Sequence, residues 1–220
     1  EIHRNECLSS DSLEQWLSSS EHGFDIDPLS MKNAGSYYPQ IFERRFAGDH
    51  DAGYKALEDA MENKIPSLGY SSLASILQKT RHKVVITTNF DNLVADALAM
   101  HAHQPPLIVA HESLTGFVRS NLRRPLIAKI HRDLFFSPKN DESGVSTMEK
   151  SWKEALEKLF QHYTPIVVGY VGNDGSLMDM LESLSPGAIS GRIIWCCRDT
   201  QTLPAKVERV LRRHDGVVTK

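Results

Sequence analysis

The sequence predicts an α/β protein of the Rossmann-like, doubly wound type, in which helices cover both faces of a parallel β-sheet. After Arg81, short apolar runs alternate with segments of helical periodicity, which is the pattern of successive βαβ units. One of these runs, Val84-Val85-Ile86, is continuous and β-branched, as is typical of a strand covered on both faces. Before Arg81 no strand pattern occurs, so we expect a helical insertion or small module to accompany the sheet.

Residues 1–80 are predicted to form helices. Ser10 or Asp11 can cap a first helix with Leu13, Trp16 and Leu17 on its apolar face. Further helices are expected over residues 39–46, 51–63 and 71–79. Their inward positions are Ile41, Phe42, Phe46, Tyr54, Leu57, Met61, Leu73, Ile76 and Leu77. We expect residues 1–80 to cover the functional site and residues 81–220 to form the core of what is one domain overall.

The predicted sheet is built from the apolar runs after Arg81. The expected strands are 84–88, 107–110, 126–130, 166–170, 193–197 and a short edge at 217–218. The expected helices between them are 91–101, 113–119, 147–163, 176–184 and 204–213. Successive strands joined by helices are expected to run parallel.

Composition excludes several classes of protein. The chain has 220 residues, a net charge of -3 and 24% charged residues, so no general basic field indicates direct binding of nucleic acid. Its apolar runs are far shorter than the roughly 20 residues that cross a bilayer, so no membrane span is expected. The cysteines are Cys7, Cys196 and Cys197, an odd number without a pairing framework, which indicates a reducing compartment and therefore the cytoplasm.

Polar residues follow three of the predicted strands at their carboxyl ends, where open parallel sheets bind ligands. The first strand leads into Thr87, Thr88, Asn89 and Asp91, the second into His131, and the third into the segment Gly169-Tyr170-Val171-Gly172-Asn173-Asp174. Because carboxyl ends of parallel strands share one edge of a sheet, we expect these residues to meet there.

Each segment also has a structural interpretation. Asn89 and Asp91 can cap the following helix. A histidine at a strand end is more often a hydrogen-bonded structural residue than a catalytic one. The glycines at 169 and 172 fit a tight turn, since they match neither G-x-G-x-x-G nor a Walker loop. The coincidence of the three segments is what favours a functional site.

The same segments resemble the SIR2-like domains, especially the sirtuin-related NAD-cleaving modules of bacterial antiphage defence systems. Thr87-Thr-Asn-Phe-Asp91 is similar to the family's T-T-N-[YF]-D, and Lys129-Ile-His131 is similar to its K-L-H-G. Gly169-Tyr-Val-Gly-Asn-Asp174 is similar to G-Y-[SG]-G-x-D, and Arg192-Ile-Ile-Trp-Cys-Cys197 to the family's late strand. Order and spacing agree across residues 71–218.

The sequence departs from the family pattern in three places. Such domains normally begin with a strand and a G-A-G-x-S phosphate-binding loop, which residues 1–60 lack, so we expect that loop to lie outside this chain. Arg132 stands where the family usually has glycine. Three cysteines without C-x-x-C spacing cannot form the zinc ribbon of the sirtuin deacylases, so no zinc is expected and protein deacylation is disfavoured.

The resemblance implies an NAD+ hydrolase, with NAD as its substrate. Asn89 would orient the attacking water or the ribose, and His131 would act as general base toward water or a ribose hydroxyl. Thr87, Thr88, Asp91, Gly169, Tyr170, Gly172 and Asp174 would contact NAD. A module that binds NAD or ADP-ribose without turnover, as a sensor or scaffold, is the alternative. The resemblance also implies a homo-oligomer and an ATPase, nuclease or phage-sensing partner.

Overall fold

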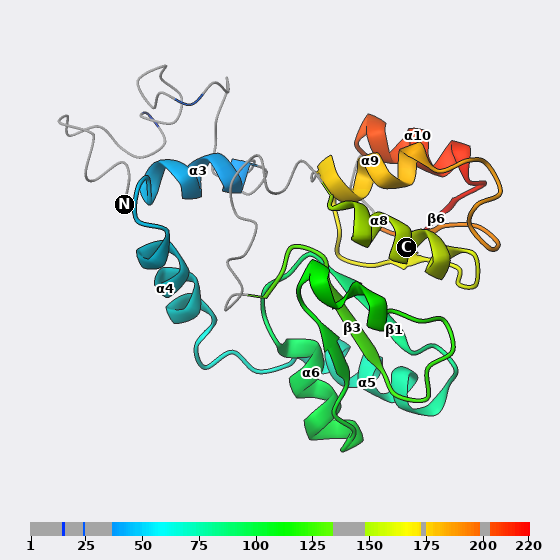
Figure 1. The fold of residues 1–220 in the computed structure, drawn as a ribbon, viewed down its shortest axis with the longest axis horizontal. Helices are drawn as coiled ribbons and strands as arrows, with labels where there is room; N and C mark the ends of the chain where they lie inside the picture. Colours follow the sequence, from blue (N-terminus) through cyan, green and yellow to red (C-terminus); the bar gives the residue numbers. More distant parts are fainter. Residues whose placement is uncertain (1–14, 16–23, 25–36, 134–147, 173–174, 199–202) are drawn as a thin grey trace.

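Strands and helices alternate along the chain in the computed structural model, which describes residues 15, 24, 37–133, 148–172, 175–198 and 203–220 (Figure 1). The strands are β1 (Val84–Thr87), β2 (Leu107–Val109), β3 (Leu126–Lys129), β4 (Ile166–Val167), β5 (Ile194–Cys196) and β6 (Val217–Thr219). The helices are α3 (Tyr38–Arg45), α4 (His50–Met61), α5 (Leu68–Lys79), α6 (Leu93–Ala97), the π-helix η3 (Leu98–Ala102), the 3₁₀-helix η4 (Glu112–Phe117), α8 (Lys150–Phe160), α9 (Gly175–Ser183) and α10 (Ala205–Arg213).

The strands form two parallel three-stranded sheets, in the orders β1-β3-β2 and β4-β5-β6. In the first sheet β3 is central, and its register pairs Thr87 of β1 with Lys129 of β3. The predicted α/β fold class with parallel strands is confirmed. The difference from the expectation is that the hydrogen-bonded ladders are two rather than one continuous sheet.

Alternate side chains of β3 pack into different hydrophobic clusters, because successive residues of a strand point to opposite faces. Leu126, Ala128 and Ile130 belong to the larger cluster, which contains α8, α9, α10 and Trp195 of β5. Ile127 belongs to a smaller cluster with residues of α5, α6 and η3. Helices therefore cover both faces of this sheet, and the larger cluster packs the two sheets into one core.

β1 differs from the expected fully buried strand, since all four of its residues are only partly buried. In the described part of the chain β1 pairs with β3 along one side only, so it is an edge of its sheet. β4 is also shorter than expected. Its ladder stops at Val167 because Gly169 has φ of +69°, which is incompatible with an extended strand. Ile166 and Val168 are 59% and 73% exposed.

The expected helices before β1 are present as α3, α4 and α5, whereas Leu13, Trp16 and Leu17 lie outside the described residues. Ile76 was expected to point inward but is 48% exposed, and Ala74 with Leu77 provides the buried face of α5 instead. Lys83 reaches back to the end of α5, where its ammonium donates to the carbonyls of Leu77 and Gln78.

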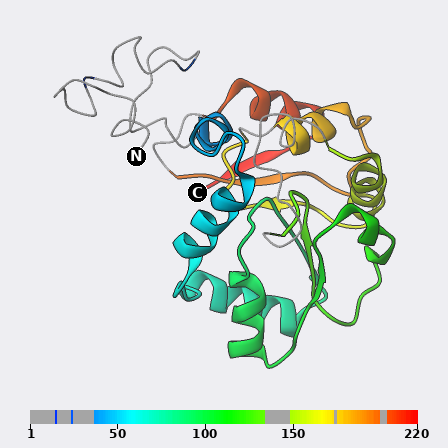
Figure 2. The ribbon, with the colours of Figure 1, turned by 60° about the vertical axis from the view of Figure 1, so that its left-hand side comes forward.

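Later helices also differ in length or type from the expectation. Residues 91–101 were expected to form one α-helix, but α6 passes into the π-helix η3. In place of the helix expected over residues 113–119, the 3₁₀-helix η4 spans Glu112–Phe117. When the molecule is turned by 60°, α4 comes to the front (Figure 2). None of the helices in the described ranges is long and apolar enough to cross a membrane.

Candidate functional site

The turn after β1 is organised by its own polar side chains. Thr87 Oγ1 accepts from the backbone N–H of Asn89 at 3.0 Å, and Asp91 Oδ1 accepts from the N–H of Leu93 at 3.0 Å. Asp91 therefore satisfies an amide at the start of α6, which is the helix-capping role considered above. Thr88 is half-buried and Asn89 is exposed. Of the four residues predicted here, Asn89 is the exposed one.

Lys129 ties this turn to the end of β3. Lys129 is only 1% exposed. Its ammonium donates to the carbonyl of Phe90 at 2.7 Å and to Oδ1 of Asn92 at 2.8 Å. It also forms an ion pair with Asp133 Oδ2 at 2.5 Å. Asp133 is fixed in turn by its backbone N–H, which donates to the carbonyl of Ala110 after β2 at 3.2 Å. One buried cation thus joins the carboxyl ends of β1 and β3.

His131 lies two residues beyond β3 and is 5% exposed. Its Nε2 is hydrogen-bonded to Oγ of Ser176 at 2.9 Å, and Ser176 is itself 2% exposed. Ser176 belongs to α9, which connects β4 to β5 in the second sheet. This bond therefore joins the end of β3 to the first turn of the helix that follows β4.

Arg132 has a backbone φ of +68°, the left-handed region that glycine adopts without cost. Its Nε donates to Glu112 Oε2 at 3.0 Å, and its Nη2 donates to Oε1 of the same carboxylate. Hydrogen bonding from the Arg132 guanidinium lowers the pKa of Glu112 to about 2. Because the Arg132 guanidinium is paired with Glu112 of η4, its charge is compensated beside the candidate site.

The segment after β4 is positioned by packing. Gly172 has φ of +83°, and a Cβ there would lie 2.5 Å from Cγ2 of Val207. A Cβ at Gly169 would meet nothing within 4 Å. Tyr170 packs against Trp195, with ring centroids 5.9 Å apart. Asp174, predicted to contact NAD, lies outside the described residues.

A pocket of about 430 Å³ opens beside the turn after β1. Its lining comes from three parts of the chain: the end of α4 and the residues after it, the turn with the start of α6, and the segment after β3. The lining residues are Glu58, Met61, Glu62, Lys64, Phe90, Asp91, Asn92, Leu93, Asp96 and Asp133. Five carboxylates and one lysine give the pocket an acidic lining, in which Asp133 is paired with Lys129 and Glu58 with Lys55.

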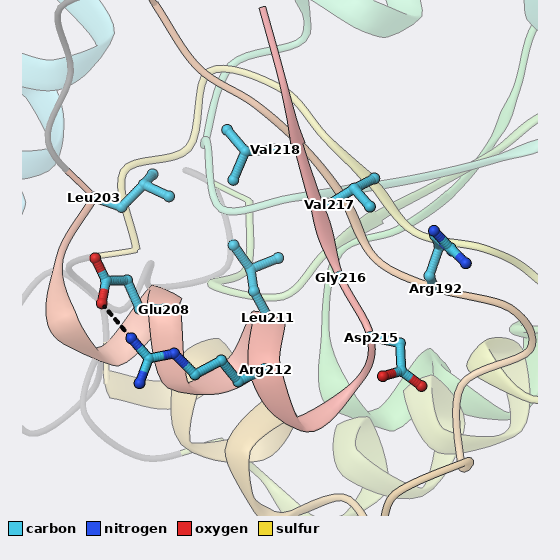
Figure 3. A pocket seen from close by; sticks show the side chains of 9 residues that line it. All are labelled: Arg192, Leu203, Glu208, Leu211, Arg212, Asp215, Gly216, Val217 and Val218. Carbon is cyan, nitrogen blue, oxygen red and sulfur yellow. Dashed lines mark hydrogen bonds and ion pairs between the residues drawn. The ribbon is translucent and has the colours of Figure 1, made fainter.

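A second pocket, of about 720 Å³, runs along α10 and β6 (Figure 3). It is lined by Arg192, Leu203, Glu208, Leu211, Arg212, Asp215, Gly216, Val217 and Val218. Arg212 in this pocket is paired with Glu208 at 3.2 Å. None of the residues predicted for the functional site lines it, so the pocket beside β1 is the one associated with the polar strand ends.

The structure links the turn after β1, the segment after β3 and α9 through residues to which the sequence had given no role. Lys129 joins the β1 turn to β3, and Ser176 joins His131 to α9. The proposed cooperation of Asn89 with His131 stays a prediction. A charged residue inside the apolar run 126–130 was the sequence signal for Lys129, whereas Ser176 carried no signal beyond its place at a helix start. Among the described residues no cluster of His, Cys, Asp and Glu fits a metal ion.

Comparison with protein families identifies the region that contains these strand ends. A family model described as SIR2-like domain matches residues 83–195, just over half of the chain. No curated protein matches the chain. Members of the matched family are NAD-dependent enzymes, so the match indicates an NAD-related activity. The matched region runs from the residue before β1 to Trp195 of β5. Because the match covers more than half of the chain, the chain belongs to the SIR2-like domain family.

Proposed function

We propose that this protein is an NAD+ hydrolase that cleaves the bond between nicotinamide and ribose, giving nicotinamide and ADP-ribose. The proposal rests on two sets of buried hydrogen bonds at the strand ends of a SIR2-like domain. Lys129 holds the turn that contains Asn89, and Ser176 holds the ring of His131. Both predicted catalytic residues thus lie on segments fixed to the same strand, β3.

The chemistry requires few groups from the protein. Water attacks C1′ of the ribose as the C1′–N1 bond breaks, and the electron pair of that bond neutralises the pyridinium nitrogen of nicotinamide. In the proposed mechanism Asn89 orients the water through its amide, which both donates and accepts. His131 takes the proton that the water loses, a task that a neutral imidazole can perform as a general base.

The acidic pocket supports contact with one end of the substrate. Carboxylates such as Asp91 accept hydrogen bonds from ribose hydroxyls or from a carboxamide, and they attract the positive pyridinium ring of NAD+. The same charges would repel a pyrophosphate. We therefore propose that the pocket between α4 and the turn after β1 does not hold the phosphates of NAD+.

The test is nicotinamide release by the full-length protein incubated with NAD+. The Asn89→Ala and His131→Ala variants are each expected to lose activity by a hundredfold or more, on the order of the contribution of a positioned acid–base group. Circular dichroism and the unfolding midpoint serve as controls for the fold. Undiminished nicotinamide release by both variants would contradict the proposed mechanism.

A non-catalytic sensor of NAD or ADP-ribose is the second candidate. The burial of His131 and its bond to Ser176 favour it, because a structural histidine would have these same features. Calorimetry separates the two candidates: saturable binding of NAD+ without nicotinamide release supports the sensor, and turnover excludes it.

We further propose that the activity depletes NAD during antiphage defence, with homo-oligomerisation or an ATPase, nuclease or phage-sensing partner controlling it. This extension rests on the resemblance of the 87–91 and 129–131 segments to SIR2-like defence modules. Phage plating on cells carrying the intact gene or its Asn89→Ala variant tests it. Equal plating on both would contradict a defence role that depends on this site.

A further inference from the structure

We propose that Lys129 is a positioning residue of the candidate site, whose ammonium sets the place of the Asn89 turn relative to His131. The inference rests on the function proposed above, because it assigns to a buried side chain a role in placing the groups of that reaction. Lys129 lies inside the β3 ladder, paired with Thr87 of β1, and its side chain continues toward the turn that follows β1.

Each N–H group of the Lys129 ammonium has a hydrogen-bond acceptor. A lysine ammonium has three N–H groups, and the structure provides three acceptors: the Phe90 carbonyl, Oδ1 of Asn92 and Oδ2 of Asp133. The first two belong to the turn after β1, and the third belongs to the segment after β3. The cation therefore bridges two loops instead of merely satisfying its own charge within one.

Burial of this lysine has a cost that packing alone does not offset. The side chain is 2% exposed, and transferring an ammonium and a carboxylate from water into such surroundings is unfavourable even when the two are paired. An apolar side chain of similar length would fill the space in β3 without that penalty. The lysine holds the two loops at a fixed relative position, which an apolar residue would not do.

The turn itself is built to receive the cation. Asn92 is at the N-cap position of α6 but makes no capping hydrogen bond with its side chain. The neighbouring Asp91 accepts from the Leu93 N–H instead, and the amide oxygen of Asn92 accepts from Lys129. The turn is thus held at Phe90 and at Asn92, immediately after Asn89 and on both sides of Asp91.

Asn92 offers the sharper test, because it is exposed and its replacement leaves the Lys129–Asp133 pair intact. Lys129→Met would leave Asp133 as a buried, uncompensated charge and can fail to fold. In the full-length protein we expect Asn92→Ala to lower kcat for nicotinamide release about tenfold, with little change in KM or in the unfolding midpoint. Asn92→Asp, which keeps an oxygen acceptor, is expected to restore kcat.

Amide hydrogen exchange gives a readout that does not depend on turnover. Asn92→Ala is expected to accelerate exchange at the Asn89 and Leu93 amides, which bond within the turn. Asn121, an exposed asparagine before the amino end of β3, provides the matched control, and Asn121→Ala should change neither rate nor exchange.

The outcomes separate this inference from the proposed function. An active wild type together with wild-type kcat and exchange in Asn92→Ala overturns the role of Lys129 and leaves the hydrolase standing. A wild type that releases no nicotinamide overturns the hydrolase, and exchange then decides the positioning role. Faster exchange in the turn supports that role, and unchanged exchange overturns it.

Discussion

At Arg132 the backbone conformation is destabilising, whereas the hydrogen bonds of the side chain are stabilising. A left-handed φ of +68° costs a residue with a Cβ about 1 kcal/mol, whereas the double hydrogen bond to Glu112 stabilises the same conformation. Glycine would remove the cost and the pairing together. Alanine would remove the pairing and keep the cost.

Arg132→Gly is therefore expected to be more stable than Arg132→Ala by about 1 kcal/mol in the free energy of unfolding. Urea denaturation of the two variants and the wild type measures the difference. Equal stability of the glycine and alanine variants would mean that the left-handed conformation is relaxed when the arginine is absent.

Glu112 makes the same pair a source of pH-dependent stability. Its pKa falls from 4.5 to about 2 on folding, chiefly because the Arg132 guanidinium donates hydrogen bonds to the carboxylate. A lowered folded pKa contributes stability above the unfolded pKa, and the contribution is lost as the pH falls toward the folded value.

The free energy of unfolding of the wild type should accordingly exceed that of Glu112→Gln at about pH 5, and the gap should close as the pH approaches about 2. Denaturant titrations at a series of pH values give this comparison. A gap that is constant with pH would show that the carboxylate is not the titrating partner of Arg132.

Single residues also show where sequence reasoning reached its limit. The polar segments after β1 and β3 were recognisable because they follow apolar runs directly. The hydrogen bond between His131 and Ser176 was not, because it joins residues that are distant in sequence and lie in separate βαβ units. The Arg132 to Glu112 pair is a tertiary contact of the same kind, so the proximity of these side chains could not be inferred from spacing.

At the scale of elements, the predicted strands were found with ends displaced by one to three residues, as the comparison of 166–170 with β4 illustrates. Apolar patterning locates a strand centre, but its end depends on where the backbone stops pairing. For β4 that point is set by Gly169, whose positive φ no hydrophobic pattern reveals.

The two glycines after β4 should respond differently to the same substitution. Gly169→Ala introduces only the strain of a positive φ, which costs about 1 kcal/mol. Gly172→Ala adds a steric clash, since the new Cβ would lie 2.5 Å from Val207 Cγ2 on α10, so roughly 2–4 kcal/mol is expected.

Thermal unfolding of the two variants provides the measurement. NAD binding by Gly169→Ala then tests whether the open position is near a ligand, because that variant is expected to retain its fold. If Gly172→Ala is as stable as Gly169→Ala, α10 does not pack as closely on this turn as the structure has it.

At the scale of the whole molecule, the alternation of strands and helices was enough to predict the α/β class with parallel strands. The division into two ladders was not predictable, since hydrogen bonding between strands depends on which edges are adjacent in space. The single large cluster that contains both β3 and β5 explains why two sheets still share a core. Whether residues 1–80 cover the site stays a prediction, although the end of α4 lines the acidic pocket.

The exposed side of β4 has a consequence for the behaviour of the protein in solution. Ile166 and Val168 present apolar side chains, and β4 pairs with β5 along one side only in the described residues. Exposed apolar side chains beside such a strand favour association between molecules. We expect light scattering to show aggregation that rises with protein concentration and is suppressed by Val168→Lys. Equal scattering by the wild type and the variant would mean that another surface drives the aggregation.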